Sequence, residues 1–132
     1  KKKKKKKKKD PPPSFQFSQE QSFPKLLKRS TILITEASIT CLEAFAYGKP
    51  VIIIENSTGL TYDPVPENIS QDLFIRCRIP AKLSDAIQHF LSYTPDQLRK
   101  NQKIGMEIRN DFFEPITQKG IYRFLDINFD QE

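Results

Sequence analysis

The fold class follows from residues 31–55, whose sequence is TILITEASITCLEAFAYGKPVIIIE. Two continuously apolar, β-branched runs, residues 31–35 and 51–55, have the composition of parallel strands covered on both faces. Between them, residues 39–47 follow a helical pattern, with Gly48 where a C-terminal cap belongs and Pro50 beyond it. Strand, helix, glycine and strand in this order predict a βαβ unit with a right-handed crossover.

The chain beyond residue 55 continues this alternation. Residues 73–78 have the pattern of a third strand, and Pro80 opens a helix whose apolar stripe ends at Leu91. Residues 94–97 form a capping box that starts a helix ending near residue 113, and residues 116–125 can form a last short helix. The intervening loop, residues 56–68, is long enough that we expect it to do more than connect. The predicted class is α/β: a Rossmann-like open parallel sheet with helices on both faces.

The charge of the chain is unevenly distributed. The 132 residues carry a formal charge of +6, but nine of the 22 Lys and Arg are Lys1–Lys9, which leaves 13 cations against 16 Asp and Glu. A basic folded domain is therefore excluded. Residues 1–23, a lysine block followed by a Pro, Ser and Gln-rich stretch, offer little to bury. They are predicted to be a disordered tail or an added tag, and residues 24–132 are predicted to be one globular domain.

Three features indicate the compartment. The lysine block runs into Asp10 and three prolines instead of an apolar segment, so no secretion signal is predicted. The longest aliphatic run, Val51–Ile54, is far shorter than a membrane span. Cys41 and Cys77 lie in apolar segments without CxxC spacing, which favours buried free thiols. We therefore expect a cytoplasmic protein.

Candidate binding residues follow the first predicted strand. In open parallel sheets, ligands bind beyond the carboxyl ends of the strands, where helix N-termini present N–H groups. The hydroxyls of Ser38 and Thr40 can contact a diphosphate there, and Glu43 can accept hydrogen bonds from ribose hydroxyls. The alternative is a capping box formed by Thr40 and Glu43, which needs no ligand and which spacing alone favours.

Weaker signals lie elsewhere in the chain. Asn56–Gly59 follows the second strand and can contact the same ligand, although a polar glycine turn explains it equally well. Arg76 and Arg78 alternate with apolar residues, which is more typical of the solvent side of an edge strand than of a phosphate clamp. His89 has no nucleophile nearby and is given no role. The motif lacks an acidic metal pair and a glycine-rich phosphate loop, so neither a metal nor a bound cofactor is predicted.

Residues 38–52 fit the pattern S-x-T-x-x-E-A-x-x-x-G-K-P-V-I, and this segment resembles the C-terminal, donor-binding domain of GT-B glycosyltransferases. Residues 83–99 and 112–115 resemble later helices of that domain, so that the likeness covers about residues 29–126. It implies that Ser38 and Thr40 lie near the phosphates of a nucleotide sugar, and Glu43 near its ribose. The expected donor-binding residues are Thr35, Glu36, Ser38, Thr40, Glu43, Asn56, Ser57, Thr58 and Gly59.

The branch of this family is left open. The retaining branch uses two glutamates separated by seven residues, but Thr35 stands eight positions before Glu43, so that pattern is absent. Residues 35–38 are more similar to the Thr-Asp-x-Ser segment of CDP-glycerol glycerophosphotransferases and related capsule or surface-carbohydrate enzymes.

The resemblance implies a metal-independent transferase whose acceptor site, and often its general base, come from an N-terminal domain. We expect the chain to bind a nucleotide-sugar donor and to need that acceptor domain or a partner chain for transfer, with the catalytic residues unassigned. The whole enzyme can associate peripherally with the inner face of the membrane. The alternatives are a non-catalytic interaction subunit, a degenerate donor-binding module or half of a sugar-nucleotide epimerase. Lys1–Lys9 can also act as an arm for polyanions, but no specific nucleic acid is expected.

Overall fold

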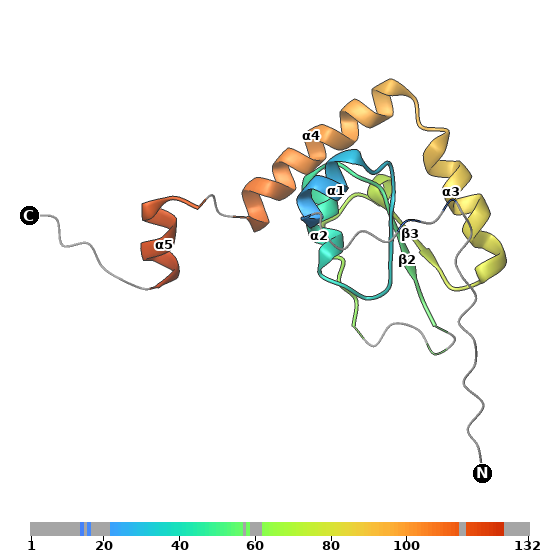
Figure 1. Ribbon diagram of the computed structural model, residues 1–132, viewed down its shortest axis with the longest axis horizontal. Coiled ribbons are helices and arrows are strands. Elements are labelled where there is room, and N and C mark those ends of the chain that lie inside the picture. Colours follow the sequence, from blue (N-terminus) through green and yellow to red (C-terminus); the bar gives the residue numbers. More distant parts are fainter. Residues whose placement is uncertain are drawn as a thin grey trace, which may run out of the picture.

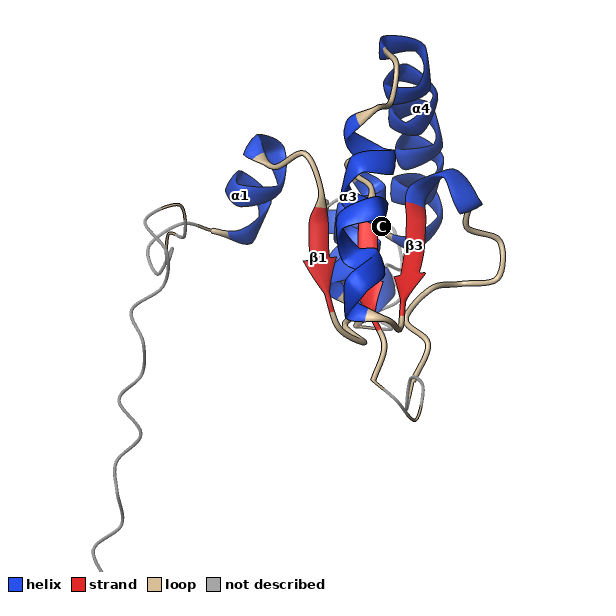
Figure 2. Cartoon of the chain, turned by 90° about the vertical axis from the view of Figure 1, so that its right-hand side faces the viewer, coloured by secondary structure: helices blue, strands red, loops and turns tan. Residues whose placement is uncertain are grey.

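The computed structural model describes residues 14, 16, 22–56, 58, 62–113 and 116–125. Three strands, β1 (Leu33–Thr35), β2 (Val51–Ile54) and β3 (Phe74–Cys77), form one sheet in the order β1-β2-β3. Both strand pairs are parallel, with Val51 opposite Leu33 on one side and Phe74 on the other. All three predicted strands are present, each slightly shorter than expected, and their carboxyl ends lie at one edge of the sheet (Figure 2).

The helices occupy nearly the predicted positions. They are α1 (Phe23–Arg29), α2 (Thr40–Ala46), α3 (Leu83–Leu91), α4 (Pro95–Phe112) and α5 (Gln118–Phe124), with short 3₁₀ turns η1 (Gln71–Leu73) and η2 (Pro80–Lys82). Helix α1 was not predicted, and its first residue, Phe23, packs against the core although the sequence places it in the tail. Helix α5 lies apart from the sheet (Figure 1). None of the described helices has the length and apolarity needed to cross a membrane.

Helices cover both faces of the sheet, which confirms the predicted α/β, Rossmann-like class. On one face, Val51 and Ile53 of β2 pack with buried residues of α1, α2 and α4. On the other face, Ile52 packs with Ala86 and Phe90 of α3. The alternation of side chains along β2 therefore supplies both layers of the core, as a central parallel strand requires.

The connection from β2 to β3 is part of the core. Its described residues form no α-helix, but three of its apolar residues, Val65, Ile69 and Leu73, are buried against the α2 face of the sheet. A parallel connection must cross from one end of the sheet to the other. In this chain the crossing segment also covers the sheet, with Val65 inside the predicted loop of residues 56–68 and Ile69 and Leu73 beyond it.

Strand β1 departs from the prediction that both its faces are covered. Ile34 lies opposite Ile52 in the register, yet 46% of Ile34 is exposed whereas Ile52 is fully buried. The reason is position: within the described residues β1 is an edge strand, and the packing of α3 is centred on β2 and β3.

Helix ends follow the local signals in the sequence. Gly48 has a φ of 64°, its N–H donates to the Phe45 carbonyl at 2.7 Å, and the Lys49 N–H donates to the Ala44 carbonyl at 2.9 Å. These two bonds make a Schellman motif that ends α2. The predicted capping box of α4 is also confirmed, because Thr94 and Gln97 bond to each other's backbone N–H groups. Both ends are fixed by residues within one helical turn.

Candidate functional site

The hydroxyls of Ser38 and Thr40 meet directly after β1. Their oxygens lie 2.9 Å apart, and the backbone N–H of Thr40 donates to Ser38 Oγ at 3.3 Å. Both residues are half-buried, and Thr40 is the first residue of α2. Thr35 ends β1 and is half-buried, whereas Glu36 is exposed in the bend that follows. The sheet therefore presents a pair of adjacent hydroxyls at its carboxyl edge.

The capping box considered for Thr40 and Glu43 is wrong. The N-cap residue of α2 is Ile39, which has helical φ and ψ and makes no side-chain cap. Thr40 lies one position too late to act as the cap, and its hydroxyl bonds to Ser38 instead. The start of α2 is instead held by Ser38, whose hydroxyl oxygen accepts the Thr40 N–H, and this local arrangement also needs no ligand.

Glu43 occupies different surroundings from the hydroxyl pair. It lines a small pocket of about 210 Å³ between α1, α2 and the end of α4, together with Pro24, Tyr47 and Arg109. Arg109 donates to the Ala46 carbonyl at 3.0 Å and lies over the Tyr47 ring, 5.3 Å from its centroid. Neither Ser38 nor Thr40 lines this pocket.

The second predicted segment forms a compact turn after β2. Asn56 Oδ1 accepts hydrogen bonds from the backbone N–H of Thr58 at 3.0 Å and from its hydroxyl at 2.7 Å. Both residues are exposed. Ser57 and Gly59, also predicted as donor-binding residues, lie outside the described residues. Because β1 and β2 are adjacent and parallel, this turn and the hydroxyl pair follow the carboxyl ends of neighbouring strands, which lie about 5 Å apart.

A charge cluster at the same edge was not predicted. Glu55 directly follows β2, and its carboxylate accepts from Arg78 at 3.1 Å and lies 3.9 Å from Arg76 Nε. Only 10% of the Glu55 side chain is exposed, compared with 62% of the Arg78 side chain. The edge-strand interpretation of the two arginines is confirmed within the described residues, but their carboxylate partners were missed.

The Arg76 guanidinium contacts two carboxylates and one aromatic ring. It also meets Asp63 at 2.6 Å and lies 4.7 Å above the centroid of the Phe74 ring. A guanidinium has five N–H donors, so these contacts leave donors available on both arginines. The signal that could have revealed the cluster is the position of Glu55 and Arg78 at the ends of neighbouring strands.

Family models, curated protein sequences and solved structures were each compared with this chain, and none of the three comparisons found a match.

The two cysteines are the other reactive groups that the sequence singled out. Cys41 and Cys77 are both buried, as expected, and burial raises the pKa of Cys41 to about 11 from its ordinary value of 9.0. Its thiol therefore stays protonated at neutral pH and does not act as a nucleophile. Among the residues that the structure describes, no group of three or more His, Cys, Asp or Glu is placed to hold a metal ion.

The carboxyl edge combines the groups that bind phosphate esters. Neutral donors come from Ser38 and Thr40 on the first strand connection, and cationic donors from Arg78 beyond the third strand. The ends of β1 and β3 are separated by two strand spacings, or about 10 Å.

Proposed function

We propose that this chain is the donor-binding half of a GT-B-type glycosyltransferase and that it holds a nucleotide sugar at the carboxyl edge of its sheet. One observation carries the proposal: the Ser38 and Thr40 hydroxyls lie 2.9 Å apart at the end of β1, within the segment that resembles the donor-binding motif of that family. Open parallel sheets bind their ligands at this edge, because the connections there carry polar groups that the strands position.

The phosphates of the donor would lie over the connection from β1 to α2. There the pair donates to a phosphate oxygen the one hydroxyl proton that its internal hydrogen bond leaves free, and the turn formed by Asn56 and Thr58 borders the ligand from the neighbouring strand. Arg78 would supply the positive charge, since it is largely exposed and its guanidinium is oriented by the nearly buried Glu55. Glu36 and Glu55 supply negative charge at the same edge, so binding depends on hydrogen-bond donors more than on net charge.

Glu43 would contact the ribose only if the nucleoside enters the space between α1, α2 and α4. The pocket there is bounded by the rings of Tyr47, Pro24 and Phe113 and by Arg109. Flat apolar walls beside a carboxylate suit a sugar with vicinal hydroxyls. The proposal thus separates two roles, with phosphate binding by the hydroxyl pair and ribose binding by Glu43, and each can fail without the other.

Transfer itself would be shared with an N-terminal acceptor domain or partner chain that contributes the general base. In that arrangement this chain stabilises the leaving nucleoside diphosphate. Negative charge develops on the leaving phosphate during transfer, so that donors aimed at it favour the transition state. No metal is assigned to this step, and the catalytic residues stay unassigned.

Isothermal titration calorimetry with UDP, GDP, CDP and their sugar conjugates tests the proposal. We expect one of these nucleotides to bind the wild-type chain, and the double variant Ser38→Ala/Thr40→Val to bind it at least tenfold more weakly, because a hydrogen bond to a charged phosphate, of about 1.5–3 kcal/mol, is lost. Ser84→Ala, on the exposed face of α3, is the matched control and should bind normally. Equal binding by all three proteins would refute the site.

Nine N-terminal lysines also attract phosphates, and the titration must separate this effect. Every variant carries the same lysines, so the difference between the double variant and the control does not depend on them. Inorganic pyrophosphate serves as a second control, since it binds lysines but lacks a nucleoside. Binding that is equal for pyrophosphate and all nucleotides, and unaffected by the double substitution, would assign the signal to the lysines.

A further inference from the structure

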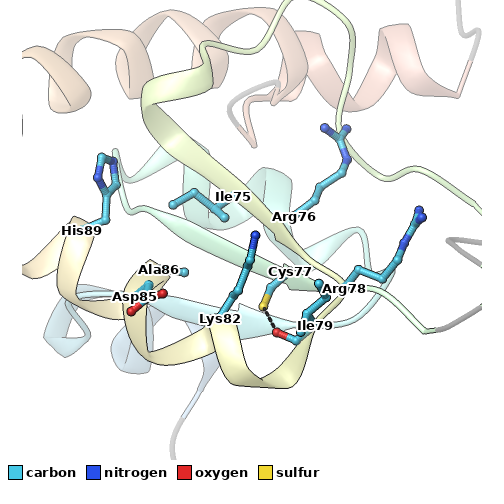
Figure 3. Close-up of a pocket in the computed structure, with 9 residues that line it drawn as sticks. All are labelled: Ile75, Arg76, Cys77, Arg78, Ile79, Lys82, Asp85, Ala86 and His89. Carbon is cyan, nitrogen blue, oxygen red and sulfur yellow. Dashed lines mark hydrogen bonds between the residues drawn. The ribbon is translucent and has the colours of Figure 1, made fainter.

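A groove of about 530 Å³ follows the outer edge of β3 (Figure 3). Ile75 and Cys77 of β3 and Ala86 of α3 line it, Lys82 extends from η2 towards the strand, and His89 lies at the opposite end. Within the described residues β3 pairs only with β2, so this edge has no neighbouring strand. The groove is separate from the hydroxyl pair, which lies beyond β1.

The free edge carries backbone groups that can accept another strand. The Glu55 N–H donates to the Cys77 carbonyl at 3.0 Å, so Cys77 faces β2. In a parallel strand, the N–H and C=O of one residue point to the same side and alternate from residue to residue. Arg76 therefore directs its N–H and C=O outward, away from β2 and along the groove. Such unpaired groups are a template for an added strand.

The two faces of this edge differ in chemistry. Ile75, Cys77 and Ile79 point to the face of the sheet that α3 covers, and Ile79 is 52% exposed. Arg76 and Arg78 point to the opposite face, where Arg76 stacks on Phe74. An added strand would meet two guanidinium groups on one side. On the other side it would meet the groove, where the apolar side chains of β3 and Ala86 lie beside Lys82, Asp85 and His89.

We propose that the free edge of β3 binds an extended peptide with alternating acidic and apolar side chains by β-strand addition. The acidic side chains would pair with Arg76 and Arg78, and the apolar ones would fill the groove beside α3. A second copy of β3 fits less well, because antiparallel self-pairing places arginines opposite arginines. This surface shares Arg78 with the proposed nucleotide-sugar site but uses neither the hydroxyl pair nor the turn of Asn56 and Thr58, so either can exist without the other.

The hexapeptide VEVEVE, acetylated and amidated at its ends, is the probe. We expect it to bind the full chain and to slow hydrogen exchange of the Arg76 amide, measured by NMR. Two variants separate strand pairing from charge, since Arg76→Ala and Arg76→Pro lose the same guanidinium but only the proline also loses the outward N–H. Arg76→Pro should bind VEVEVE about tenfold more weakly than Arg76→Ala.

Thermal melts of both variants establish that they are folded. If Arg76→Pro does not fold, VEVEVE carrying N-methyl groups on alternate amides replaces it, because this peptide keeps the side chains and loses backbone donors. The N-methylated peptide should bind at least tenfold more weakly, and VKVKVK should not protect the Arg76 amide. Equal binding of the methylated and unmethylated peptides, or binding of VEVEVE without protection of Arg76, would overturn the proposal and leave attraction by Lys1–Lys9 as the explanation.

Discussion

Gly48 and Gly105 lie backbone to backbone where the end of α2 crosses α4. A Cβ atom added to Gly105 would fall 2.5 Å from the Gly48 nitrogen and 2.7 Å from the Phe45 carbonyl oxygen, and one added to Gly48 would fall 2.7 Å from the carbonyl oxygen of Asn101. The contact thus joins two backbones with no side chain between them. It fixes α4 against α2, and through α2 it sets the position of the Ser38 and Thr40 hydroxyls.

Gly105→Ala should lower the free energy of unfolding by about 2 kcal/mol, because the atoms that crowd the new methyl group belong to the backbone and cannot rotate away. The sign of this change in the free energy of unfolding is informative, because alanine in an uncrowded helix stabilises by about 0.5–1 kcal/mol relative to glycine. Urea unfolding measures the change, with Lys103→Ala on the exposed side of α4 as the control. A stabilised Gly105→Ala protein would contradict the close crossing.

Glu55→Gln should lower the free energy of unfolding by about 1 kcal/mol, because one nearly buried carboxylate serves both Arg76 and Arg78. The largely exposed pair of Arg99 and Asp96 on α4 offers a comparison, and Arg99→Gln should cost less than about 0.5 kcal/mol. Both values come from urea unfolding at two salt concentrations. Equal costs for the two variants would show that Glu55 does not organise the arginines.

Stability should fall with rising pH between 9 and 11. Burial raises the pKa of Cys41 from 9.0 to about 11, so in this window the unfolded chain gives up a proton that the folded chain keeps. The stabilisation that the protonated Cys41 thiol contributes is complete below pH 9. Above pH 9 it decreases by up to about 1.4 kcal/mol per pH unit. Burial also raises the pKa of Tyr93, and the hydrogen bond to Asp72 raises the pKa of Lys100. Both shifts likewise lower stability as the pH rises. Urea unfolding at pH 8, 9 and 10 should show that the free energy of unfolding falls less with pH in Cys41→Ala than in the wild-type protein. An identical fall in the two proteins would disprove the role of the thiol.

Asn101→Leu should raise the free energy of unfolding by about 1 kcal/mol. Asn101 is 1% exposed, and its side-chain Nδ2 has no hydrogen-bond partner, so the folded state leaves a desolvated donor unsatisfied. Leucine has a similar size and no polar atom to satisfy. Asn110→Leu, at an exposed position of the same helix, should leave the thermal midpoint unchanged. A clear destabilisation by Asn101→Leu would indicate a partner for the amide in solution.

The sequence predicted those features that depend on neighbours within a few residues. The βαβ unit, the glycine that ends α2 and the capping box of α4 each follow from side chains within one or two turns of one another. The predicted N-cap of α2, Thr40, was wrong by one position, because the N-cap is Ile39. The Thr40 hydroxyl therefore bonds to Ser38 and does not form a capping box with Glu43. Helix α1 was missed because its seven residues have too few apolar positions to show a period.

Features that depend on distant segments could not be predicted in this way. The pairing of Glu55 with Arg78 requires knowing that β2 and β3 are neighbours and which of their residues lie at the edge. The exposure of Ile34 depends on β1 having no second neighbour within the described residues. Gly105 looks in sequence like a weak point of a helix, and only the crossing with Gly48 explains it.

The central claim is that a nucleotide sugar binds at the carboxyl edge of the sheet. Its most direct test is NMR of the isotopically labelled chain during titration with UDP, GDP or CDP and their sugars, in salt high enough to suppress binding to Lys1–Lys9. We predict that one nucleotide shifts the amide resonances of residues 36–40 and of Asn56 and Thr58, and that Ser38→Ala/Thr40→Val abolishes these shifts. Titrations in which every nucleotide leaves these resonances unmoved, or moves only those of the lysine block, would contradict the claim.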